Sequence, residues 1–355
     1  MLLKTTPDFQ PKPTTASSPQ KRRSRFGNLR GWSLFAGLSL PVLWLIENLI
    51  GEHTEISALL AYFPQHPWGI IPLLCFILSL IHKQARLVLW NGAALLFWAW
   101  ALLCVKWHPF AATTKSTVRV VTYNVALREY FSSQLADEIA KQNPDIVCLQ
   151  ESVRTYPLEE AGRNNVGKAI SRRFPGWNIR TGGDTCIMTR FPISSSRDHP
   201  LRLTRRTLDV TVETPQGPLR VLSTHISTAF GGQGKFATLF GQLVELIPNA
   251  QKAAQARLDQ IKPLDDALDA DLSTPLVLCG DFNTPPRGIF YRHLDSRLDD
   301  GFAQAGNGMG LTFPSRAPLL RIDYVWTRGA HVKSIKVGER GASDHRMVIA
   351  DIAVK

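Results

Sequence analysis

The 355-residue sequence predicts an α/β domain of two packed sheets flanked by helices, preceded by transmembrane helices. Residues 31–106 contain long uncharged runs, and from residue 116 short apolar runs rich in β-branched residues alternate with helical patterns. The chain is 44% hydrophobic and 20% charged, which excludes a wholly disordered or fibrous protein. Its five cysteines form no close pair, so a disulfide framework is also excluded.

Residues 1–30 are predicted to form a disordered, basic cytoplasmic tail. They hold seven of the 41 basic residues but only one acidic residue, Asp8. They contain few large apolar side chains, so they cannot bury enough surface to offset the entropy lost on ordering. Because much of the net charge of +12 lies in this tail, bulk charge is weak evidence for nucleic-acid binding.

Residues 31–106 are predicted to hold two or three transmembrane helices, at about 32–50, 59–81 and 87–105. The first has Glu47 as its only charged residue and the last has none, and each is close to the ~20 residues that cross a bilayer. The middle stretch is uncharged but contains Pro64 and Pro67. We expect it to span with a kink, and a two-helix arrangement remains the alternative.

The charges beside these helices predict their orientation. Basic residues precede the first helix, and Lys83 and Arg86 separate the second from the third, whereas Glu52 and Glu55 occupy the first loop. By the positive-inside rule, three helices place the basic segments in the cytoplasm and residues 116–355 outside it. A two-helix arrangement would instead place residues 116–355 in the cytoplasm. We therefore expect a multi-pass protein of the inner or plasma membrane, with the lipid bilayer as its partner.

The segment from residue 116 to 355 contains most of the predicted strands and helices. Helices are predicted at 134–142 and 250–261, and a hairpin turn at 214–217. The predicted strands are 118–124, 145–151, 184–189, 208–213, 219–225, 275–281, 321–326 and 347–352.

Polar residues capable of chemistry recur at or next to the ends of these strands. They are Asn124, Glu151, His225, Asp281 with Asn283, Asp323, and Asp344 with His345. Each alone has an ordinary explanation: Asn124 could begin a turn, and Asp323 could pair with Arg321. Strands of one layered core tend to end on shared rims, however, so these residues can converge. Carboxylates gathered on one rim would need a cation or bound substrate to organise them.

Six short runs containing these residues resemble a known family. They are TYNV (122–125), LQE (149–151), STH (223–225), GDFN (280–283), IDYVW (322–326) and SDH (343–345). In this order they resemble the endonuclease/exonuclease/phosphatase superfamily, here as a membrane-anchored, bacterial-type member, over about residues 116–355. The resemblance implies a four-layer α/β/β/α sandwich and metal-dependent hydrolysis of phosphate esters.

The resemblance also implies a metal site. Glu151 is the expected oxygen ligand of Mg²⁺, with Mn²⁺ as the alternative ion, and Asn124 and Asp344 are expected nearby. Magnesium usually keeps several waters and takes one or two carboxylates, which suits a sparse site. Whether one or two ions bind stays open.

Five further residues at the positions that carry the resemblance are expected to take part in catalysis. Asp281 and Asn283 lie two apart, so on an extended segment they would face the same way and orient one water, with Asp281 taking its proton. His345 is expected to contact the phosphate, with Asp323 fixing its tautomer. His225 is expected to donate a hydrogen bond or proton towards the phosphate or the leaving oxygen.

The sequence therefore predicts a membrane-anchored phosphoesterase acting on a phosphate ester, most simply a phosphodiester. The substrate stays open between nucleic acid, for an extracytoplasmic nuclease, and a phospholipid headgroup. A catalytically inactive, membrane-tethered binding protein is the alternative from another class. Weaker candidates for phosphate contacts are Arg190, Arg205, Arg206 and Arg257, for which solvated ion pairs are the more ordinary role. Residues 231–235 are predicted to form a flexible loop that follows the strand carrying His225.

Overall fold

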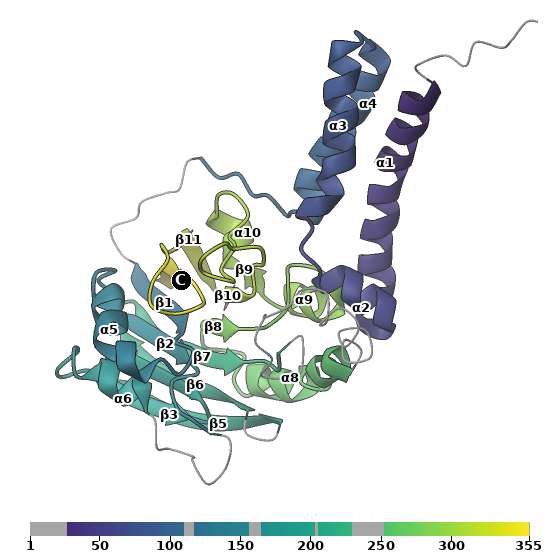
Figure 1. Ribbon diagram of the computed structural model, residues 1–355. Coiled ribbons are helices and arrows are strands. Elements are labelled where there is room, and N and C mark those ends of the chain that lie inside the picture. The colour runs from purple at the N-terminus through teal and green to yellow at the C-terminus, as the bar shows by residue number, and fades with distance from the viewer. Residues whose placement is uncertain (1–26, 110–116, 156–164, 203–204, 229–251, 355) are drawn as a thin grey trace, which may run out of the picture.

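The computed structural model describes residues 27–109, 117–155, 165–202, 205–228 and 252–354. Figure 1 shows two parts, a bundle of three helices and an α/β domain at its foot. Most of the predicted tail and the loop at 231–235 lie outside the described residues.

The bundle consists of α1, α3 and α4, with a short helix, α2, at the end nearest the α/β domain (Figure 1). Two continuous helical stretches, Asn28–His53 and Ala85–Leu102, are long and apolar enough to cross a membrane. The bounds in this part are α1 Gly27–Leu45, η1 Ile46–Ile50, η2 Gly51–His53, α2 Glu55–Tyr62, η3 His66–Gly69, α3 Ile70–Ile81, α4 Ala85–Phe97 and η4 Trp98–Leu102.

The region predicted as a helix at 59–81 is divided in the structure. Helix α2 and the stretch His66–Ile81 meet at an angle of 79°, so the bundle has two candidate spans, or three if this bent pair is one span. Phe63, which precedes Pro64, is extended with ψ 141°. A residue before proline avoids the helical conformation, which explains why α2 ends there.

The bundle has polar side chains inside and apolar side chains outside. Asn91 is fully buried, and its Nδ2 donates to Ser33 Oγ at 3.0 Å and to Ser79 Oγ at 3.2 Å, so one amide joins all three helices. The bundle's exposed large apolar residues include Trp32, Phe35, Leu38, Leu89, Leu96 and Trp100. A buried apolar cluster of Leu40, Leu43, Ala94 and Leu102 also lies inside the bundle, but the outer face of the bundle is apolar, where that of a water-soluble bundle is polar.

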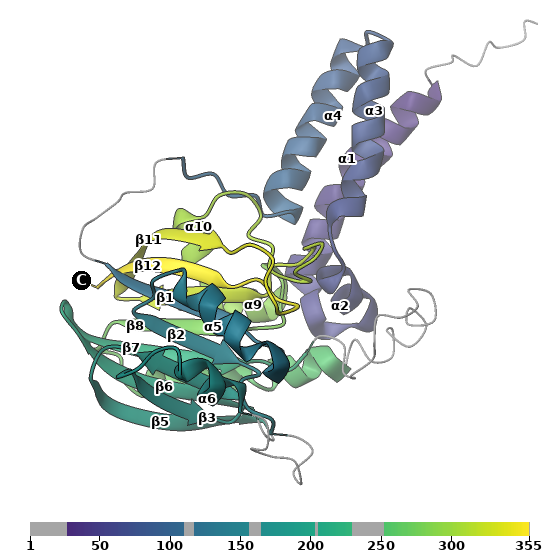
Figure 2. The same cartoon turned by 60° about the vertical axis from the view of Figure 1, so that its left-hand side comes forward.

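The α/β domain contains two six-stranded sheets, stacked face to face in Figure 2. The first has the order β11 (Ala330–Val337), β12 (Val348–Val354), β1 (Val118–Asn124), β2 (Ile146–Gln150), β4 (Thr185–Thr189), β3 (Asn178–Gly182). The second has the order β5 (Ile193–Arg202), β6 (Arg205–Thr214), β7 (Gly217–His225), β8 (Leu276–Asp281), β10 (Asp323–Arg328), β9 (Asp299–Asp300).

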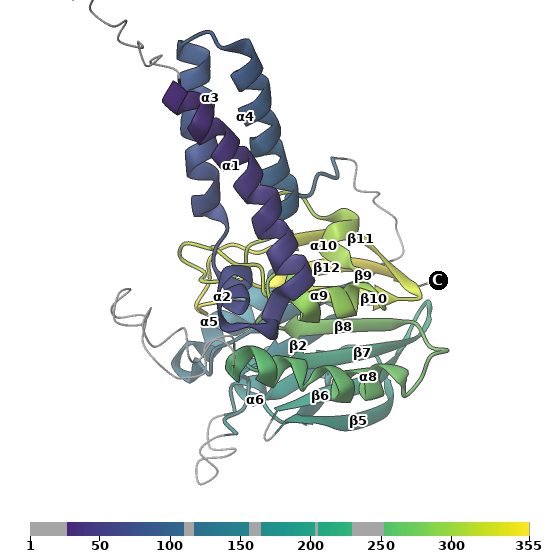
Figure 3. The same cartoon turned by 90° about the vertical axis from the view of Figure 1, so that its right-hand side faces the viewer.

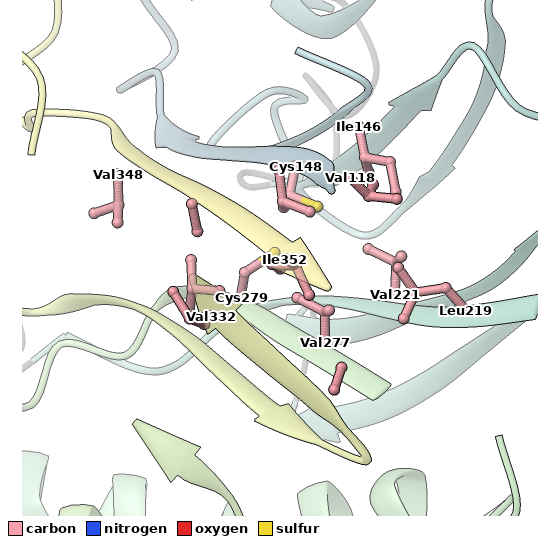
Figure 4. Packing of buried hydrophobic residues seen from close by; sticks show 14 of the residues in the cluster. Val118, Ile146, Cys148, Leu219, Val221, Val277, Cys279, Val332, Val348 and Ile352 are labelled. Carbon is pink, nitrogen blue, oxygen red and sulfur yellow. The ribbon is translucent and has the colours of Figure 1, made fainter. Parts of the chain in front are cut away.

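Three apolar clusters hold the layers together. Between the sheets, residues such as Val118, Cys148, Val277 and Ile352 pack against one another (Figure 4). Helices α5 (Ser132–Ala140) and α6 (Val166–Ser171) pack on the outer face of the first sheet, whereas α8 (Ile261–Asp269) and α9 (Gly288–Asp295) pack on that of the second (Figure 3). The predicted fold class, a four-layer α/β/β/α sandwich, is confirmed. The remaining short helices are η5 (Glu129–Phe131) and α10 (Gly301–Ala305).

The strands predicted from β-branched runs are confirmed, with ends shifted by a few residues, and so is the hairpin turn at 214–217. The predicted helix at 250–261 is helical over 252–258, and α8 begins after it with Pro263 in its first turn. Proline is tolerated there because the first amides of a helix have no partner within it. Strands β3, β5, β9 and β11 were not predicted; most side chains of β5 are exposed, so it lacks an apolar face.

Candidate active site at the strand ends

The backbone brings the predicted residues to one edge of the two sheets. Strands β1 and β2 are parallel and finish together, with Asn124 opposite Gln150, directly before Glu151. Strands β7 and β8 are also parallel, with His225 opposite Asp281, and the antiparallel β10 begins at Asp323 opposite the same Asp281. We call the eight predicted residues at this edge the rim: Asn124, Glu151, His225, Asp281, Asn283, Asp323, Asp344 and His345.

Asp281 is the centre of the rim and is only 1% exposed. Its Oδ2 accepts hydrogen bonds from Asn124 Nδ2 at 3.0 Å and from Asn283 Nδ2 at 3.2 Å. The same oxygen lies 3.6 Å from His225 Nε2 and 3.8 Å from His345 Nε2. Burial raises the pKa of Asp281, and the positive charge of the two histidines offsets only part of that rise.

The loop after β8 is not the extended segment that the spacing of Asp281 and Asn283 suggested. Asn283 has φ 49°, so the chain turns there, and its backbone N–H donates to Asp281 Oδ1 at 2.9 Å. Asn tolerates this left-handed conformation better than most residues. The turn still brings the two side chains together, while Asn283 Nδ2 also donates to Ile226 O at 3.0 Å and so connects the loops after β7 and β8.

His345 contacts Asp323 through one nitrogen of its ring. Its Nδ1 lies 3.0 Å from Asp323 Oδ2 and 3.2 Å from Oδ1, which leaves Nε2 directed at Asp281. Burial alone would lower the pKa of His345, but the charges of Asp323 and Asp281 raise it to about 10. Arg321, the ordinary partner considered for Asp323, instead pairs with Asp300 at 2.8 Å.

His225 is held by Asp184, which the sequence did not identify as part of the site, and by Arg205, which the sequence offered only as a weak candidate for a phosphate contact. His225 Nδ1 lies 2.7 Å from Asp184 Oδ2, and Arg205 Nη1 lies 2.6 Å from the same oxygen and also contacts the ring. Burial would raise the pKa of Asp184, but His225 and Arg205 lower it overall. His225 Nε2 is buried without a hydrogen-bond partner in the described structure and lies 3.8 Å from Glu151 Oε1.

Glu151 is partly open, with 32% of its side chain exposed. Asn124 Nδ2 lies 3.3 Å from Glu151 Oε1, and Asn124 Oδ1 accepts from Ala126 N at 2.9 Å. Asn124 therefore positions Glu151 in this arrangement. Asp344 is half-buried on the neighbouring loop, which Ser343 ties to β1 by donating from Oγ to Asn124 O at 2.6 Å.

The chemistry of these side chains fits a divalent cation. The carboxylate of Glu151 is partly exposed, so a cation bound there could keep several of its waters, as Mg²⁺ does. Asp281, Asp323 and His345 also have ligand atoms within 4.8 Å of one another, the one such group of His, Cys, Asp or Glu among the residues described. All three are buried, His345 is hydrogen-bonded to Asp323, and its Nε2 lies 3.8 Å from Asp281 Oδ2, so protonated His345 can supply the positive charge that the two carboxylates need.

The four arginines considered for phosphate contacts all have protein partners. Arg190 pairs with Asp145, and Arg206 lies 3.5 Å from Asp198. Arg205 supports His225, as described above. Arg257 is buried and donates from Nε to Tyr62 OH at 2.9 Å. Arg190 and Arg206 thus form ordinary ion pairs, whereas Arg205 and Arg257 hold other residues in place.

Several solved structures resemble this fold. An endonuclease/exonuclease/phosphatase from Bacteroides vulgatus has a TM-score of 0.51 and 15% identity, over 68% of this chain and 100% of its own. An endonuclease/exonuclease/phosphatase family protein from Leptotrichia buccalis has a TM-score of 0.50 and 17% identity, over 66% and 98%. A functionally unknown conserved protein from Enterococcus faecalis has a TM-score of 0.50 and 16% identity, over 67% and 100%. At these identities the likeness shows the fold alone.

No curated protein matches the chain. The family model described as Endonuclease/Exonuclease/phosphatase family matches residues 121–345. This range is well over half of the 355 residues and includes all eight residues of the rim. The chain therefore belongs to the endonuclease/exonuclease/phosphatase family.

Proposed function

We propose that this protein is a membrane-anchored, metal-dependent phosphoesterase that hydrolyses a phosphodiester through a water activated by Asp281. Members of the family are hydrolases of phosphate esters. One observation carries the proposal: the buried carboxylate of Asp281 faces the Nε2 atoms of two imidazoles, and each imidazole is held at Nδ1 by another carboxylate.

The first chemical task is to generate a nucleophile. Asp281 accepts the proton of a water that Asn283 helps to orient, since their side chains meet in the turn after β8. The raised pKa of Asp281 makes it a stronger base than an exposed aspartate, which favours proton transfer near neutral pH.

The two histidines supply the complementary donors. Protonated His345 donates from Nε2 to a phosphoryl oxygen while Asp323 accepts at Nδ1. His225, with Asp184 on its Nδ1, donates from Nε2 to the phosphoryl or leaving oxygen. Its unpartnered buried Nε2 supports this role, because a buried polar atom without a partner is costly unless a ligand satisfies it.

Glu151, with Asn124 and Asp344 beside it, would hold Mg²⁺ or, as the alternative, Mn²⁺. When bound, such an ion neutralises negative charge on the phosphoryl oxygens as they approach the transition state.

The helical bundle supports a location in the inner or plasma membrane. Its outward apolar residues match a lipid environment, and an amide such as that of Asn91 commonly joins helices inside a bilayer. The start of α1 and the turn between α3 and α4 lie at the end of the bundle remote from the α/β domain (Figure 1). Lys83 belongs to that turn, and Arg86 is in the first turn of α4. With three spans, this arrangement and the positive-inside rule favour an α/β domain outside the cytoplasm.

A fusion of alkaline phosphatase after Lys115 tests this orientation. We expect an active fusion, because that enzyme works only after export. An inactive fusion at a site where green fluorescent protein is fluorescent would place the domain in the cytoplasm.

The site's position favours a substrate at the membrane surface. Thr284, which follows Asn283 directly, lies 3.2 Å from the hydroxyl of Tyr62 in α2, at the foot of the bundle. A phospholipid headgroup would be concentrated beside such a site. An extracytoplasmic nuclease is the second candidate, because the family's shared core serves both kinds of phosphodiester.

The full-length protein in detergent micelles should be offered phospholipid vesicles, plasmid DNA and RNA in parallel, with and without Mg²⁺. We expect metal-dependent cleavage of one substrate class that EDTA abolishes and added Mg²⁺ restores. Asp281→Asn serves as the blank. Cleavage that persists in both EDTA and the Asp281→Asn protein would contradict the proposed mechanism.

A further inference from the structure

The contact between the bundle and the α/β domain contains a buried tyrosine with three polar partners. Tyr62, the last residue of α2, is 3% exposed. Its hydroxyl lies 3.2 Å from Glu52 Oε1 and 3.2 Å from Thr284 Oγ1, and it accepts from Arg257 Nε at 2.9 Å. The guanidinium of Arg257 also lies over the Tyr62 ring, 4.1 Å from its centroid.

Both partners from the α/β domain belong to, or hold, the loops that carry the rim. Thr284 directly follows Asn283 in the loop after β8. Arg257 Nη1 donates to Thr228 O at 3.0 Å, in the loop that follows His225. These are the two loops that Asn283 joins through Ile226. The Tyr62 hydroxyl is thus a second connection between them, and it comes from outside the α/β domain.

Two further residues near Tyr62, one from the bundle and one from the α/β domain, make hydrogen bonds to the other part. Glu52 Oε2 accepts from Ile289 N at 2.6 Å, at the start of α9. Arg287 is buried and donates to Ala61 O and to Leu102 O, each at 2.8 Å, where α2 and η4 end. The bundle therefore supplies an acceptor for a backbone N–H at the start of α9, and the α/β domain supplies donors for backbone carbonyls at the ends of α2 and η4. These helix-end groups have no partner within their own helices. We call Glu52, Tyr62, Arg257, Thr284 and Arg287 the junction.

We propose that Tyr62 is a positioning residue for catalysis: its hydroxyl holds the loops of His225 and Asp281 in their reactive arrangement. The membrane-proximal helix α2 then supports the active site as well as tethering it. Small displacements of reacting groups, on the order of 1 Å, can cost about 100-fold in rate, so a hydroxyl one residue from Asn283 can matter to chemistry. This inference rests on the proposed phosphoesterase function.

The test compares Tyr62→Phe with Tyr291→Phe in the full-length protein. Tyr291 is a matched control, because its hydroxyl also makes a hydrogen bond, to Asp300 Oδ2 at 2.8 Å, and Asp300 lies outside both loops of the rim. With the cleaved substrate class as probe, we expect Tyr62→Phe to lower kcat about tenfold with KM changed less than about twofold. Tyr291→Phe should keep the wild-type kcat, although both variants lower the unfolding midpoint similarly.

Thr284 provides a second readout that does not depend on changing Tyr62. Thr284→Val should lower kcat as Tyr62→Phe does, Thr284→Ser should restore it, and the double variant Tyr62→Phe with Thr284→Val should be no worse than either single one. Wild-type kcat in Tyr62→Phe, or equal losses in Tyr62→Phe and Tyr291→Phe, would overturn the positioning role.

Asp281→Asn separates the two possible failures. If Asp281→Asn is inactive while Tyr62→Phe retains full kcat, the active site stands and the role of Tyr62 is wrong. If Asp281→Asn retains full activity, the proposed function itself fails.

Discussion

The rim and the junction are both buried and polar, and they adjoin at Asn283 and Thr284, yet their charges are satisfied differently. In the junction, Glu52, Arg257 and Arg287 each make at least two hydrogen bonds. In the rim, Asp281 has hydrogen bonds but also faces a second buried carboxylate, Asp323, whose charge adds to the rise in its pKa.

This difference distinguishes a site for chemistry from a structural contact. Buried groups with perturbed pKa values and unpaired atoms cost stability, and proteins keep them mainly where function requires them. Fully bonded buried charges instead fix how two parts of a protein fit together. Substitutions in the rim should therefore cost activity more than stability. Substitutions in the junction should show the opposite balance, except at Tyr62 and its partner Thr284, which lie between the two.

The largest effect is expected for Asp281→Asn. The amide cannot accept the water's proton, so kcat should fall by about 10³-fold or more. Stability should be unchanged or higher, because the variant removes one of two neighbouring buried carboxylates. Steady-state kinetics and denaturant unfolding of the full-length protein measure both. If the variant loses activity only because it unfolds, Asp281 is a structural residue and not a catalytic one.

Asp323→Asn should have the next largest effect, about 10²-fold in kcat, because His345 would lose the partner that orients it. The charge of Asp323 raises the pKa of His345, so its removal should lower that pKa from about 10. In the proposed mechanism His345 acts in its protonated form, so activity should be lost as pH rises through its pKa. The alkaline limb of the pH–rate profile should therefore move to lower pH. An alkaline limb that stays in place would show that another group titrates there.

The sequence could predict the rim because its residues are tied to strand ends. Apolar runs that end in Asn124, Glu151, His225 and Asp281 place the strands, and the shared edge of a layered fold then brings the ends together. The sequence could not predict Asp184 as the partner of His225. Asp184 precedes β4 in the first sheet and Arg205 begins β6 in the second, so no local pattern links either of them to His225.

The junction was missed for a different physical reason. Composition predicts a membrane region at residues 31–106, and under that prediction the polar residues there resemble loop charges or interruptions of a span. Glu52 was used only as evidence of orientation, and Tyr62 lay inside an uncharged run. Their roles depend on the break between α2 and α3, which turns α2 towards the α/β domain. Hydrophobicity alone does not encode that contact.

The smallest effect we predict is a loss of stability without a comparable loss of activity, in Glu52→Gln. The glutamine can still accept from Tyr62, but it cannot offer a second carboxylate oxygen to Ile289 N at the start of α9. Losing a charged acceptor at a helix N-terminus should lower the free energy of unfolding by about 1–2 kcal/mol. We expect kcat to stay within about twofold of wild type, because the Tyr62 bonds to Thr284 and Arg257 remain.

Glu55→Gln is the matched control, since Glu55 is exposed in the same segment and the same chemical change there should alter stability less. Denaturant unfolding in detergent and kinetics on the same samples separate the two effects. A tenfold loss of kcat in Glu52→Gln with unchanged stability would mean that the acid itself serves the rim. The boundary between structural and catalytic residues would then lie on the membrane side of Tyr62, and the supporting shell of the active site would include the loop between α1 and α2.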